Sequence, residues 1–363
     1  MTESNTIHTI SRVAILGAGA FGFALASLLS ENHPRLPIVL YDPVKEFVDS
    51  IRDHHCHPVF HQGVIVPASV TATTSLPDAV RDANLIIFAV PGQFVRGAAK
   101  SLVPLLQKDR LQDPQRPCII LNVAKALEPD THKPLLDVIG EELRAGSSFS
   151  GPASQAYLSQ MYPLAVLSGG MIADEVSKHW PIGADIACAN LDVARQLQSL
   201  FSSPTFKVNI TRDVLGVQLA GALKNVVAIG AGLFDGLGYD DSSKAAFVSE
   251  AAREMKHFAM QLGAHAETFE LGGQAWLGDL LTTCFGKSRN RYLGELLGKG
   301  KSVEEALHIL EQEKKRAEGY LTTKAFYELA KENGLRMPIL TILYGVLFSK
   351  KPVQRAIVEF MAV

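Results

Sequence analysis

A glycine-rich segment near the start of the chain restricts the fold more than any other part of the sequence. The β-branched run at residues 12–16 leads into GAGAFG at 17–22, and the helix-forming run FALASLLSE follows. Strand, glycine turn and helix in this order are typical of a dinucleotide-binding βα unit. In such a unit the glycines allow a tight turn, a close approach of the backbone to a pyrophosphate, and close packing of helix on strand. We therefore expect this turn to bind a dinucleotide cofactor through Gly17, Gly19, Ala20, Phe21 and Gly22.

A carboxylate follows the second strand of this unit. The apolar run Pro37–Tyr41 ends at Asp42, which lies 20 residues beyond Gly22. An acidic side chain at this place accepts hydrogen bonds from the adenosine ribose hydroxyls and repels a 2′-phosphate. The spacing therefore predicts NAD rather than NADP as the cofactor. The alternative is a structural glycine turn followed by a surface aspartate.

Two further apolar runs indicate where the rest of a cofactor site would lie. Residues 84–90 form one buried strand, ended by Pro91, and residues 117–123 form another, with Lys125 just beyond it. Ligands of open parallel sheets lie beyond the carboxyl ends of the strands. We therefore expect Pro91, Phe94 and Lys125 on the ligand-binding rim, although a solvated surface lysine is the commoner case at such a position.

The order of the elements predicts the domain organisation. Strands and helices alternate to about residue 208, and the sequence from Asp213 onward is helical. Alternating elements are typical of an α/β, doubly wound and mainly parallel sheet. We predict a dinucleotide-binding Rossmann domain over residues 1–210 and an all-helical, substrate-binding and catalytic domain over residues 211–363. A chain of 363 residues is long enough for two domains.

The helical half contains an unusual apolar run, LAGALKNVVAIGAGLF at 219–234, in which only Lys224 and Asn225 carry polar side chains. The run is shorter than the roughly 20 residues that a membrane span needs, so we expect a buried helix and no stable membrane insertion. An ammonium group in such surroundings must lie in a polar cleft, pair with a carboxylate, or lose its proton. Lys224 is therefore our first candidate for a general acid or base. The alternative is a lysine that extends to the surface.

Two further polar clusters lie in the helical half. Asp279 stands in the apolar setting WLGDLLTT and is a natural partner for a buried ammonium group. The segment SRNR at 288–291 places two guanidinium groups beside an amide, which suits the capture of a phosphate or carboxylate by Arg289 and Asn290. A solvated basic turn is an equally weighted alternative for SRNR.

The composition limits the classes of partner and compartment. The chain is 47% hydrophobic and 20% charged, with a formal net charge of −2, which argues against nucleic acid or an anionic membrane surface as the main partner. The four cysteines are far apart and form no CxxC pair, as expected for reduced thiols. We find no signal-peptide pattern in MTESNTIHTISR and expect a cytoplasmic protein.

A histidine-rich segment, DHHCH at 53–57 with His61 close behind, invites a metal interpretation. Adjacent side chains point in different directions, however, and the spacing matches no regular zinc motif. We expect a polar loop here and no metal site.

The chain resembles the NAD(P)-dependent glycerol-3-phosphate dehydrogenase family over nearly its whole length. The resemblance is carried, in the family's order, by GAGAFG (17–22), VPGQF (90–94), NVAKALEP (122–129), GALKNVVAIGAGLFDGLG (221–238), LGDLLTTC (277–284), SRNR (288–291) and AEG (317–319). The GALKN and SRNR blocks are far more specific than the glycine motif. The resemblance implies a Rossmann domain, an all-helical C-terminal domain and a homodimer.

The same resemblance implies roles for individual residues. It makes Lys224 the general acid/base, gives Lys125 a place beside both substrate and cofactor, and lets Asp279 hold Lys224. It also implies a glycerol phosphate site lined by Asn225, Thr283, Arg289 and Asn290, and contacts from Glu318 and Arg289 to the cofactor.

The sequence departs from the family pattern at three places. Glu250 stands where members usually have an arginine, the loop at 151–157 reads GPASQAY, and the histidine-rich segment replaces a loop with asparagine and leucine-proline. These changes bear on the substrate more than on the cofactor. We expect an NAD-dependent interconversion of sn-glycerol 3-phosphate and dihydroxyacetone phosphate. The alternatives are a paralogue that acts on another small phosphorylated polyol or ketose, and a dinucleotide-sensing protein without turnover.

Overall fold

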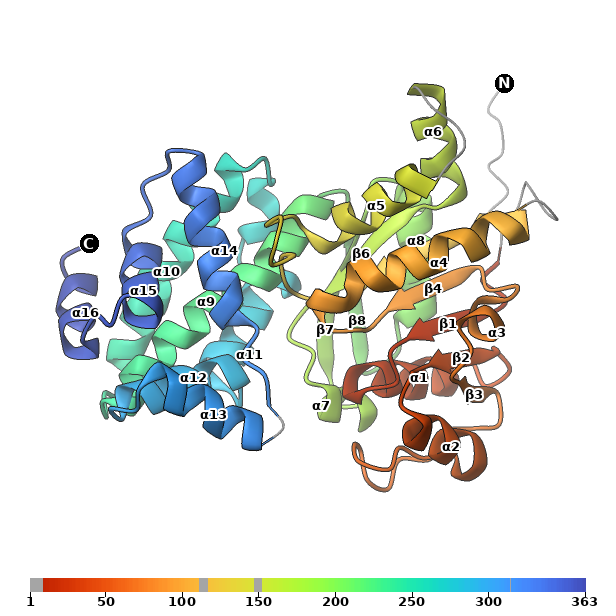
Figure 1. Cartoon of the computed structure of the whole chain (residues 1–363), viewed down its shortest axis with the longest axis horizontal. Coiled ribbons are helices and arrows are strands. Elements are labelled where there is room, and N and C mark those ends of the chain that lie inside the picture. The colour runs from red at the N-terminus through yellow and green to blue at the C-terminus, as the bar shows by residue number, and fades with distance from the viewer. Residues whose placement is uncertain (1–8, 111–116, 147–151, 314) are drawn as a thin grey trace. The chain divides into compact units, whose positions relative to one another are not determined.

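The structure is a computed structural model that describes residues 9–110, 117–146, 152–313 and 315–363 (Figure 1). The chain divides into two compact units, of which the first contains residues 1–124 and 135–214 and the second contains residues 125–134 and 215–363. The division near residue 214 lies close to the position expected from the sequence. The segment Lys125–Pro134 differs, because it belongs to the second unit although it follows a strand of the first. The loop at 151–157 begins outside the described residues.

The first unit contains one sheet in the order β3-β2-β1-β4-β5-β6-β7-β8. Its strands are β1 (Val13–Leu16), β2 (Ile38–Tyr41), β3 (Val70–Thr73), β4 (Leu85–Phe88), β5 (Ile119–Asn122), β6 (Leu164–Ser168), β7 (Ile182–Cys188) and β8 (Phe206–Thr211). Neighbouring strands pair in parallel except β6 and β7, which are antiparallel. The order 3-2-1-4-5-6 is that of a doubly wound dinucleotide-binding sheet, so the predicted fold class is confirmed.

Helices cover both faces of this sheet. They are α1 (Ala20–Asn32), α2 (Lys45–His54), α3 (Leu76–Val80), the short η1 (Gly92–Phe94), α4 (Val95–Arg110), α5 (Leu135–Gly146), α6 (Pro152–Met161), α7 (Ala173–Ser177) and α8 (Leu191–Phe201). Val13 and Ile15 of β1 join a core with α1, α7 and α8, while Ala14 and Leu16 are equally buried and point to the other face. Burial on both faces explains why the strands are continuous apolar runs.

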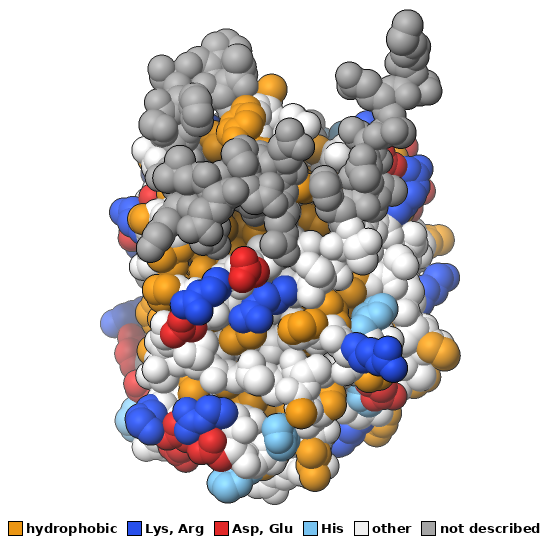
Figure 2. All heavy atoms as spheres, turned by 90° about the vertical axis from the view of Figure 1, so that its right-hand side faces the viewer, with side chains coloured by type: hydrophobic (Ala, Val, Ile, Leu, Met, Phe, Trp, Pro, Cys, Tyr) orange, Lys and Arg blue, Asp and Glu red, His pale blue; other side chains and the backbone are white. Residues whose placement is uncertain are grey.

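The surface of the first unit carries charges of both signs. On the face that Figure 2 shows, Lys and Arg side chains are interspersed with Asp and Glu among the described residues. This distribution agrees with the small net charge of −2.

The second unit is helical. It contains α9 (Val214–Gly236), α10 (Asp241–Gln261), the 3₁₀ turn η2 (Ala266–Phe269), the π-helical turn η3 (Gln274–Gly278), α11 (Asp279–Phe285), α12 (Arg289–Gly298), α13 (Val303–Gln312), α14 (Gly319–Glu332), α15 (Pro338–Phe348) and α16 (Val353–Phe360). The sequence pattern at residues 302–318 indicates a single helix, but this prediction is wrong at its end because α13 stops at Gln312. Its start is set by a capping box between Ser302 and Glu305.

Helix α9 forms the centre of this unit, and its glycines bring α12 into backbone contact. A Cβ atom on Gly232 would lie 1.9 Å from the carbonyl oxygen of Arg291, and one on Gly294 would lie 1.9 Å from that of Ile229. By length and composition alone, α9 would also be apolar enough to cross a bilayer. However, 89% of its most apolar window is buried within the protein, and a core helix passes the same test.

Candidate active site

The lysine of α9 lies in a buried polar cluster within the helical unit. Lys224 is 8% exposed, and its Nζ donates to Thr283 Oγ1 at 2.8 Å and lies 3.0 Å from Asp279 Oδ1. Thr283 Oγ1 in turn donates to Asp279 Oδ1 at 3.1 Å. Asp279 and Thr283 are four residues apart on α11, so both side chains project from one face of that helix.

Asp279 is the centre of the cluster and binds a second lysine. Its Oδ2 accepts from Lys125 Nζ at 2.6 Å. Asp279 is only 2% exposed and begins α11 directly after the π-helical turn, where the helix dipole also favours negative charge. The sequence predicted a bond from Asp279 to Lys224, whereas the structure shows one carboxylate shared by two ammonium groups.

The burial and charges of the cluster shift pKa values in opposite directions. Burial lowers the pKa of Lys125, and the attraction of Asp279 only partly opposes this shift. The pKa of Asp279 is lowered because Lys125 and Lys224 together outweigh the effect of burial, which would raise it. The carboxylate is therefore ionised over the whole neutral range. Because its pKa is lowered, Lys125 releases its proton more readily than an exposed lysine does.

The segment that carries Lys125 is fixed to the helical unit. Asn225 Nδ2 donates to the Lys125 carbonyl oxygen at 3.3 Å, and His132 Nε2 lies 3.1 Å from Glu328 Oε2 on α14. The segment closes on itself through an antiparallel bridge between Leu127 and Pro134. These contacts explain why Lys125–Pro134 belongs to the second unit.

A chain of amide hydrogen bonds continues from Lys125 through the cluster. Asn225 Oδ1 accepts from Asn290 Nδ2 at 2.8 Å, and Asn290 Oδ1 accepts from the Gly319 backbone N–H at 2.9 Å. Asn225 and Asn290 are 3% and 7% exposed. Gly319 allows this approach because a Cβ there would lie 2.7 Å from the Asn225 carbonyl oxygen. The amide of Asn290 is therefore used inside the protein, although the sequence predicted that it faces the substrate.

The two arginines of SRNR have different surroundings. The side chain of Arg291 is bound within the protein. Its Nε donates to the Gly286 carbonyl oxygen at 2.8 Å, and its Nη1 donates to Asp235 Oδ2 at 2.6 Å. Arg289 is exposed at the first position of α12, and the described residues provide no hydrogen bond or ion pair to its side chain. Arg289 is therefore the guanidinium that can take an external anion.

Glu318 lies half-buried directly before α14. Its charge is near enough to raise the pKa of Lys125, against the larger effect of burial. All the predicted residues of the second unit therefore converge except Arg289, for which no contact with the cluster is seen.

The glycine turn of the first unit fits a dinucleotide. Gly17 has φ +109°, and a Cβ there would lie 2.7 Å from the Ala89 carbonyl oxygen. A Cβ on Gly22 would lie 1.9 Å from the Gly17 carbonyl oxygen, whereas a Cβ on Gly19 would meet no atom within 4 Å. Gly17 and Gly22 are thus required by packing, and the space beside Gly19 is open to a ligand.

Asp42 lies at the carboxyl end of β2, as predicted, but it also has a structural role. Its Oδ2 accepts from the Ala18 backbone N–H at 2.8 Å, and its Oδ1 accepts from that of Val44 at 2.9 Å. A carboxylate has about four acceptor positions, so two remain for ribose hydroxyls. Pro91 and Phe94 follow β4 and are exposed, Phe94 at 52%.

The histidine-rich segment differs from the expected polar loop. His57 is 3% exposed, the side chain of His61 is 4% exposed, and both rings bind carbonyl oxygens of the glycine turn. Across the described residues, no group of three or more His, Cys, Asp or Glu side chains is arranged to hold a metal ion. Sequence reasoning missed this contact, and the only available signal was the departure from the family pattern.

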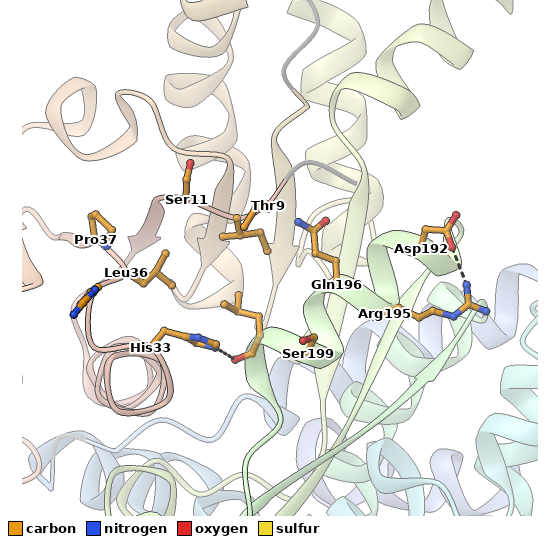
Figure 3. Close-up of a pocket in the computed structure, with 12 residues that line it drawn as sticks. Thr9, Ser11, His33, Leu36, Pro37, Asp192, Arg195, Gln196 and Ser199 are labelled. Atoms are coloured by element: carbon orange, nitrogen blue, oxygen red, sulfur yellow. Dashed lines mark hydrogen bonds and ion pairs between the residues drawn. The ribbon is translucent and has the colours of Figure 1, made fainter. Parts of the chain in front are cut away.

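A surface cavity of about 650 Å³ also lies in the first unit (Figure 3). It is lined by residues that precede β1 and β2 and by α8, including Thr9, His33 and Arg195. The glycine turn and Asp42 follow these strands, so the cavity lies at the opposite edge of the sheet. Two of its polar groups bind within the protein: His33 to the Leu200 carbonyl oxygen and Arg195 to Asp192.

A doubly wound sheet with this glycine turn, joined to a helical unit with a lysine–carboxylate cluster, defines a dinucleotide-dependent dehydrogenase class. The N-terminal and C-terminal models of NAD-dependent glycerol-3-phosphate dehydrogenase match residues 12–194 and 213–358. The chain therefore belongs to the NAD-dependent glycerol-3-phosphate dehydrogenase family.

Individual relatives agree with this assignment. The chain is 37% identical over 351 residues to glycerol-3-phosphate dehydrogenase (NAD(P)+) of Chlorobium phaeobacteroides, covering 96% of this chain and 97% of the relative. It is 35% identical over 353 residues to the enzyme of the same name from Clostridium botulinum, covering 97% of each chain. The crystal structure of glycerol-3-phosphate dehydrogenase from Coxiella burnetii superposes with a TM-score of 0.83 at 26% identity, covering 98% and 99% of the two chains.

Proposed function

We propose that this protein interconverts sn-glycerol 3-phosphate and dihydroxyacetone phosphate with NAD as cofactor, and that Lys224 is its general acid/base. The observation that carries the proposal is the convergence of Lys125 and Lys224 on the buried carboxylate of Asp279. A protein that only senses a dinucleotide needs no buried proton donor. The family relationship supports the substrate, and the fit of the glycine turn supports the cofactor.

The protein's own residues would handle the proton in carbonyl reduction. NADH, when bound, supplies the hydride that adds to the carbonyl carbon. Lys224 donates its proton to the carbonyl oxygen as negative charge develops there, and solvent then reprotonates the amine. In the oxidising direction the neutral amine removes the hydroxyl proton.

The rest of the cluster holds Lys224 and adds charge. Thr283 and Asp279 bind the Lys224 ammonium from one side and so fix its direction. Lys125 brings a second positive charge, which stabilises the developing alkoxide. Because Asp279 carries a single negative charge, the three ionised groups together have an excess of one positive charge, as an oxyanion requires.

Arg289 would bind the substrate phosphate. Its exposed guanidinium can form two parallel hydrogen bonds to phosphate oxygens. Binding energy gained at the phosphate, remote from the reacting carbon, would orient the carbonyl for reaction. Asn290 would contribute by holding Asn225 and Gly319, as its hydrogen bonds indicate.

The decisive experiment incubates the purified protein with NADH and a panel of phosphorylated ketones while NADH absorbance is followed. Oxidation of NADH with dihydroxyacetone phosphate at a higher kcat/KM than with every other ketone supports the proposal. A preference for a different phosphorylated ketone would identify a paralogue. Binding of NADH with no turnover on any ketone would identify a sensing protein. We also propose that the protein is a homodimer in the cytoplasm, which light scattering and cell fractionation would test.

A further inference from the structure

We propose that His57 and His61 are positioning residues of the cofactor site. They bind the carbonyl groups of the glycine turn and thereby direct its backbone N–H groups toward the cofactor pyrophosphate. The histidine-rich segment thus holds the glycine turn in place, and its rings bind the backbone of the turn rather than a metal ion.

His57 binds the turn from a buried position with a defined tautomer. Its Nδ1 accepts from the backbone N–H groups of Val59 at 3.0 Å and Phe60 at 3.1 Å. The proton of the neutral ring must therefore be on Nε2, which donates to the Ala18 carbonyl oxygen at 2.9 Å. Burial lowers the pKa of His57 to about 4, so the ring is neutral and keeps this donor at neutral pH.

His61 binds the carbonyl group of Ala20, two residues after Ala18. Its Nε2 lies 2.7 Å from the Ala20 carbonyl oxygen, and its Nδ1 lies 3.0 Å from Ser177 Oγ on α7. The Asp174 carboxylate lies 3.9 Å from the same Nδ1. Both ring nitrogens are thus engaged, and the ring cannot rotate without losing a contact.

Peptide geometry converts these contacts into a direction for the amides. In a planar trans peptide the C=O and the following N–H point in opposite directions. Holding the Ala18 carbonyl toward His57 therefore turns the Gly19 N–H away from His57. Holding the Ala20 carbonyl toward His61 does the same for the Phe21 N–H.

These two amides are among the free donors at the start of α1. Gly19 is the N-cap residue and has no side-chain cap, and within the described residues the N–H groups of Gly19 and Phe21 have no acceptor. A helix N-terminus with free amides binds phosphate. The space beside Gly19 is open, as shown by the absence of any atom within 4 Å of a Cβ built there.

Aromatic packing holds the rings of His57 and His61 against α1 and α2. The His57 ring packs on Phe47 at a centroid distance of 4.5 Å and meets Phe23 edge-on at 5.6 Å. The His61 ring stacks on Phe23 at a centroid distance of 6.2 Å with an interplanar angle of 9°. Phe23 belongs to the helix whose N-terminus is being oriented, so the rings and the amides form one rigid group.

The test compares variants that keep the ring but remove its donors. His57→Phe and His61→Phe should each raise the Kd for ADP-ribose about tenfold, whereas the Kd for adenosine, which has no phosphate, should change less than twofold. His57→Gln and His61→Gln keep an N–H donor and should stay within about threefold of the wild type. His54→Phe is the matched control, because His54 is exposed on the same segment and should bind ADP-ribose as the wild type does.

Unfolding temperatures separate positioning from a purely structural role. If the Phe variants unfold at lower temperature but bind ADP-ribose with the wild-type Kd, the proposal is wrong. If they do not fold, NMR of wild-type protein with isotope-labelled histidine decides instead. A proton on Nδ1 of His57, or ring signals of His57 and His61 that ADP-ribose leaves unchanged, would equally overturn the proposal.

Discussion

Lys125 and Lys224 bind different oxygens of the same buried carboxylate, at 2.6 Å and 3.0 Å. The two lysines are 99 residues apart in the sequence and are brought together by Asp279 alone among the ion pairs described. Burial of one carboxylate with two ammonium groups is stable only because each charge keeps hydrogen-bonding partners. The same arrangement leaves positive charge in excess at the place where the proposed reaction develops an oxyanion.

Substitution of the lysine on α9 tests the proposed proton donor. Lys224→Ala should lower kcat about 10²–10⁴-fold, which is the usual contribution of general acid catalysis. The affinity for NADH should be unchanged, because the glycine turn and Asp42 belong to the other unit. Steady-state kinetics with dihydroxyacetone phosphate, together with NADH titration and thermal unfolding, provide the measurement. A folded variant that binds NADH and keeps the wild-type kcat would disprove the mechanism.

Neutralising Asp279 should change the pH dependence of the reaction. The Asp279 charge opposes the lowering of the Lys125 pKa by burial, so Asp279→Asn should lower that pKa further. The positive charge of Lys125 is then lost at a lower pH. Because this charge stabilises the developing alkoxide, the alkaline limb of the pH profile of kcat/KM for carbonyl reduction should move to lower pH. An alkaline limb at the wild-type position would contradict this coupling.

The same variant makes a prediction for stability. The folded-state pKa of Asp279 is lowered below the ordinary aspartate value of 3.8, because Lys125 and Lys224 outweigh the effect of burial. The stabilisation from its ionised form is therefore present above pH 3.8 and is lost as the pH falls through the lower, folded-state pKa. Acid unfolding of the wild type should show this loss, whereas Asp279→Asn should be less stable at neutral pH and less sensitive to acid in that range.

Local patterns in the sequence were sufficient to predict the fold. The apolar strands, the glycine turn and the buried helix around Lys224 each form where the pattern indicates, because burial dictates their composition. The end of α13 at Gln312 could not be predicted, since the following EKKRAE contains no glycine or proline. The assignment of Lys125–Pro134 to the helical unit could not be predicted either. It depends on long-range contacts such as that between His132 and Glu328.

The candidate site was predictable in its members but not in its connections. The sequence singled out Lys224 and Asp279 because charged residues in apolar runs need partners. It could not show that Lys125 also binds the Asp279 carboxylate, nor that the Asn290 amide donates its hydrogen bond to Asn225. Such pairings are set by tertiary packing, which leaves no periodic signal in the chain.

The position of Asp42 predicts the choice between the two nicotinamide cofactors. Its carboxylate should repel the 2′-phosphate of NADPH, so kcat/KM should favour NADH by at least about tenfold, which corresponds to 1.4 kcal/mol. Asp42→Asn should reduce this preference. It should also destabilise the glycine turn, because an amide has only one acceptor oxygen for the Ala18 and Val44 N–H groups. Equal kcat/KM values for the two cofactors in the wild type would refute the prediction.

The two arginines of SRNR provide a matched pair for the phosphate site. Arg289→Lys should raise the KM for dihydroxyacetone phosphate about tenfold, because a lysine cannot reproduce the bidentate hydrogen bonds of a guanidinium. Arg291→Lys should leave that KM nearly unchanged and instead lower the unfolding temperature, since Arg291 binds Asp235 and the Gly286 carbonyl oxygen. If both variants changed KM equally, or if neither did, SRNR would not be a specific phosphate site.

Asn290 should act through the residues it holds rather than through the substrate. Asn290→Ala would leave two buried groups without a partner, the side-chain oxygen Oδ1 of Asn225 and the backbone N–H of Gly319. Each buried polar group left unsatisfied costs about 1–3 kcal/mol, so the free energy of unfolding should fall by several kcal/mol at most.

The kinetic effect of Asn290→Ala follows from the amide chain. Asn225 donates to the backbone of Lys125, and loosening it displaces one of the two ammonium groups of the cluster. We therefore expect kcat to fall at least about tenfold, equivalent to 1.4 kcal/mol at the transition state, with a smaller rise in KM than in Arg289→Lys. Asn333→Ala, at the exposed end of α14, is the control and should change neither value. A variant with wild-type kcat and a strongly raised KM would instead show that the Asn290 amide turns outward to bind the phosphate itself.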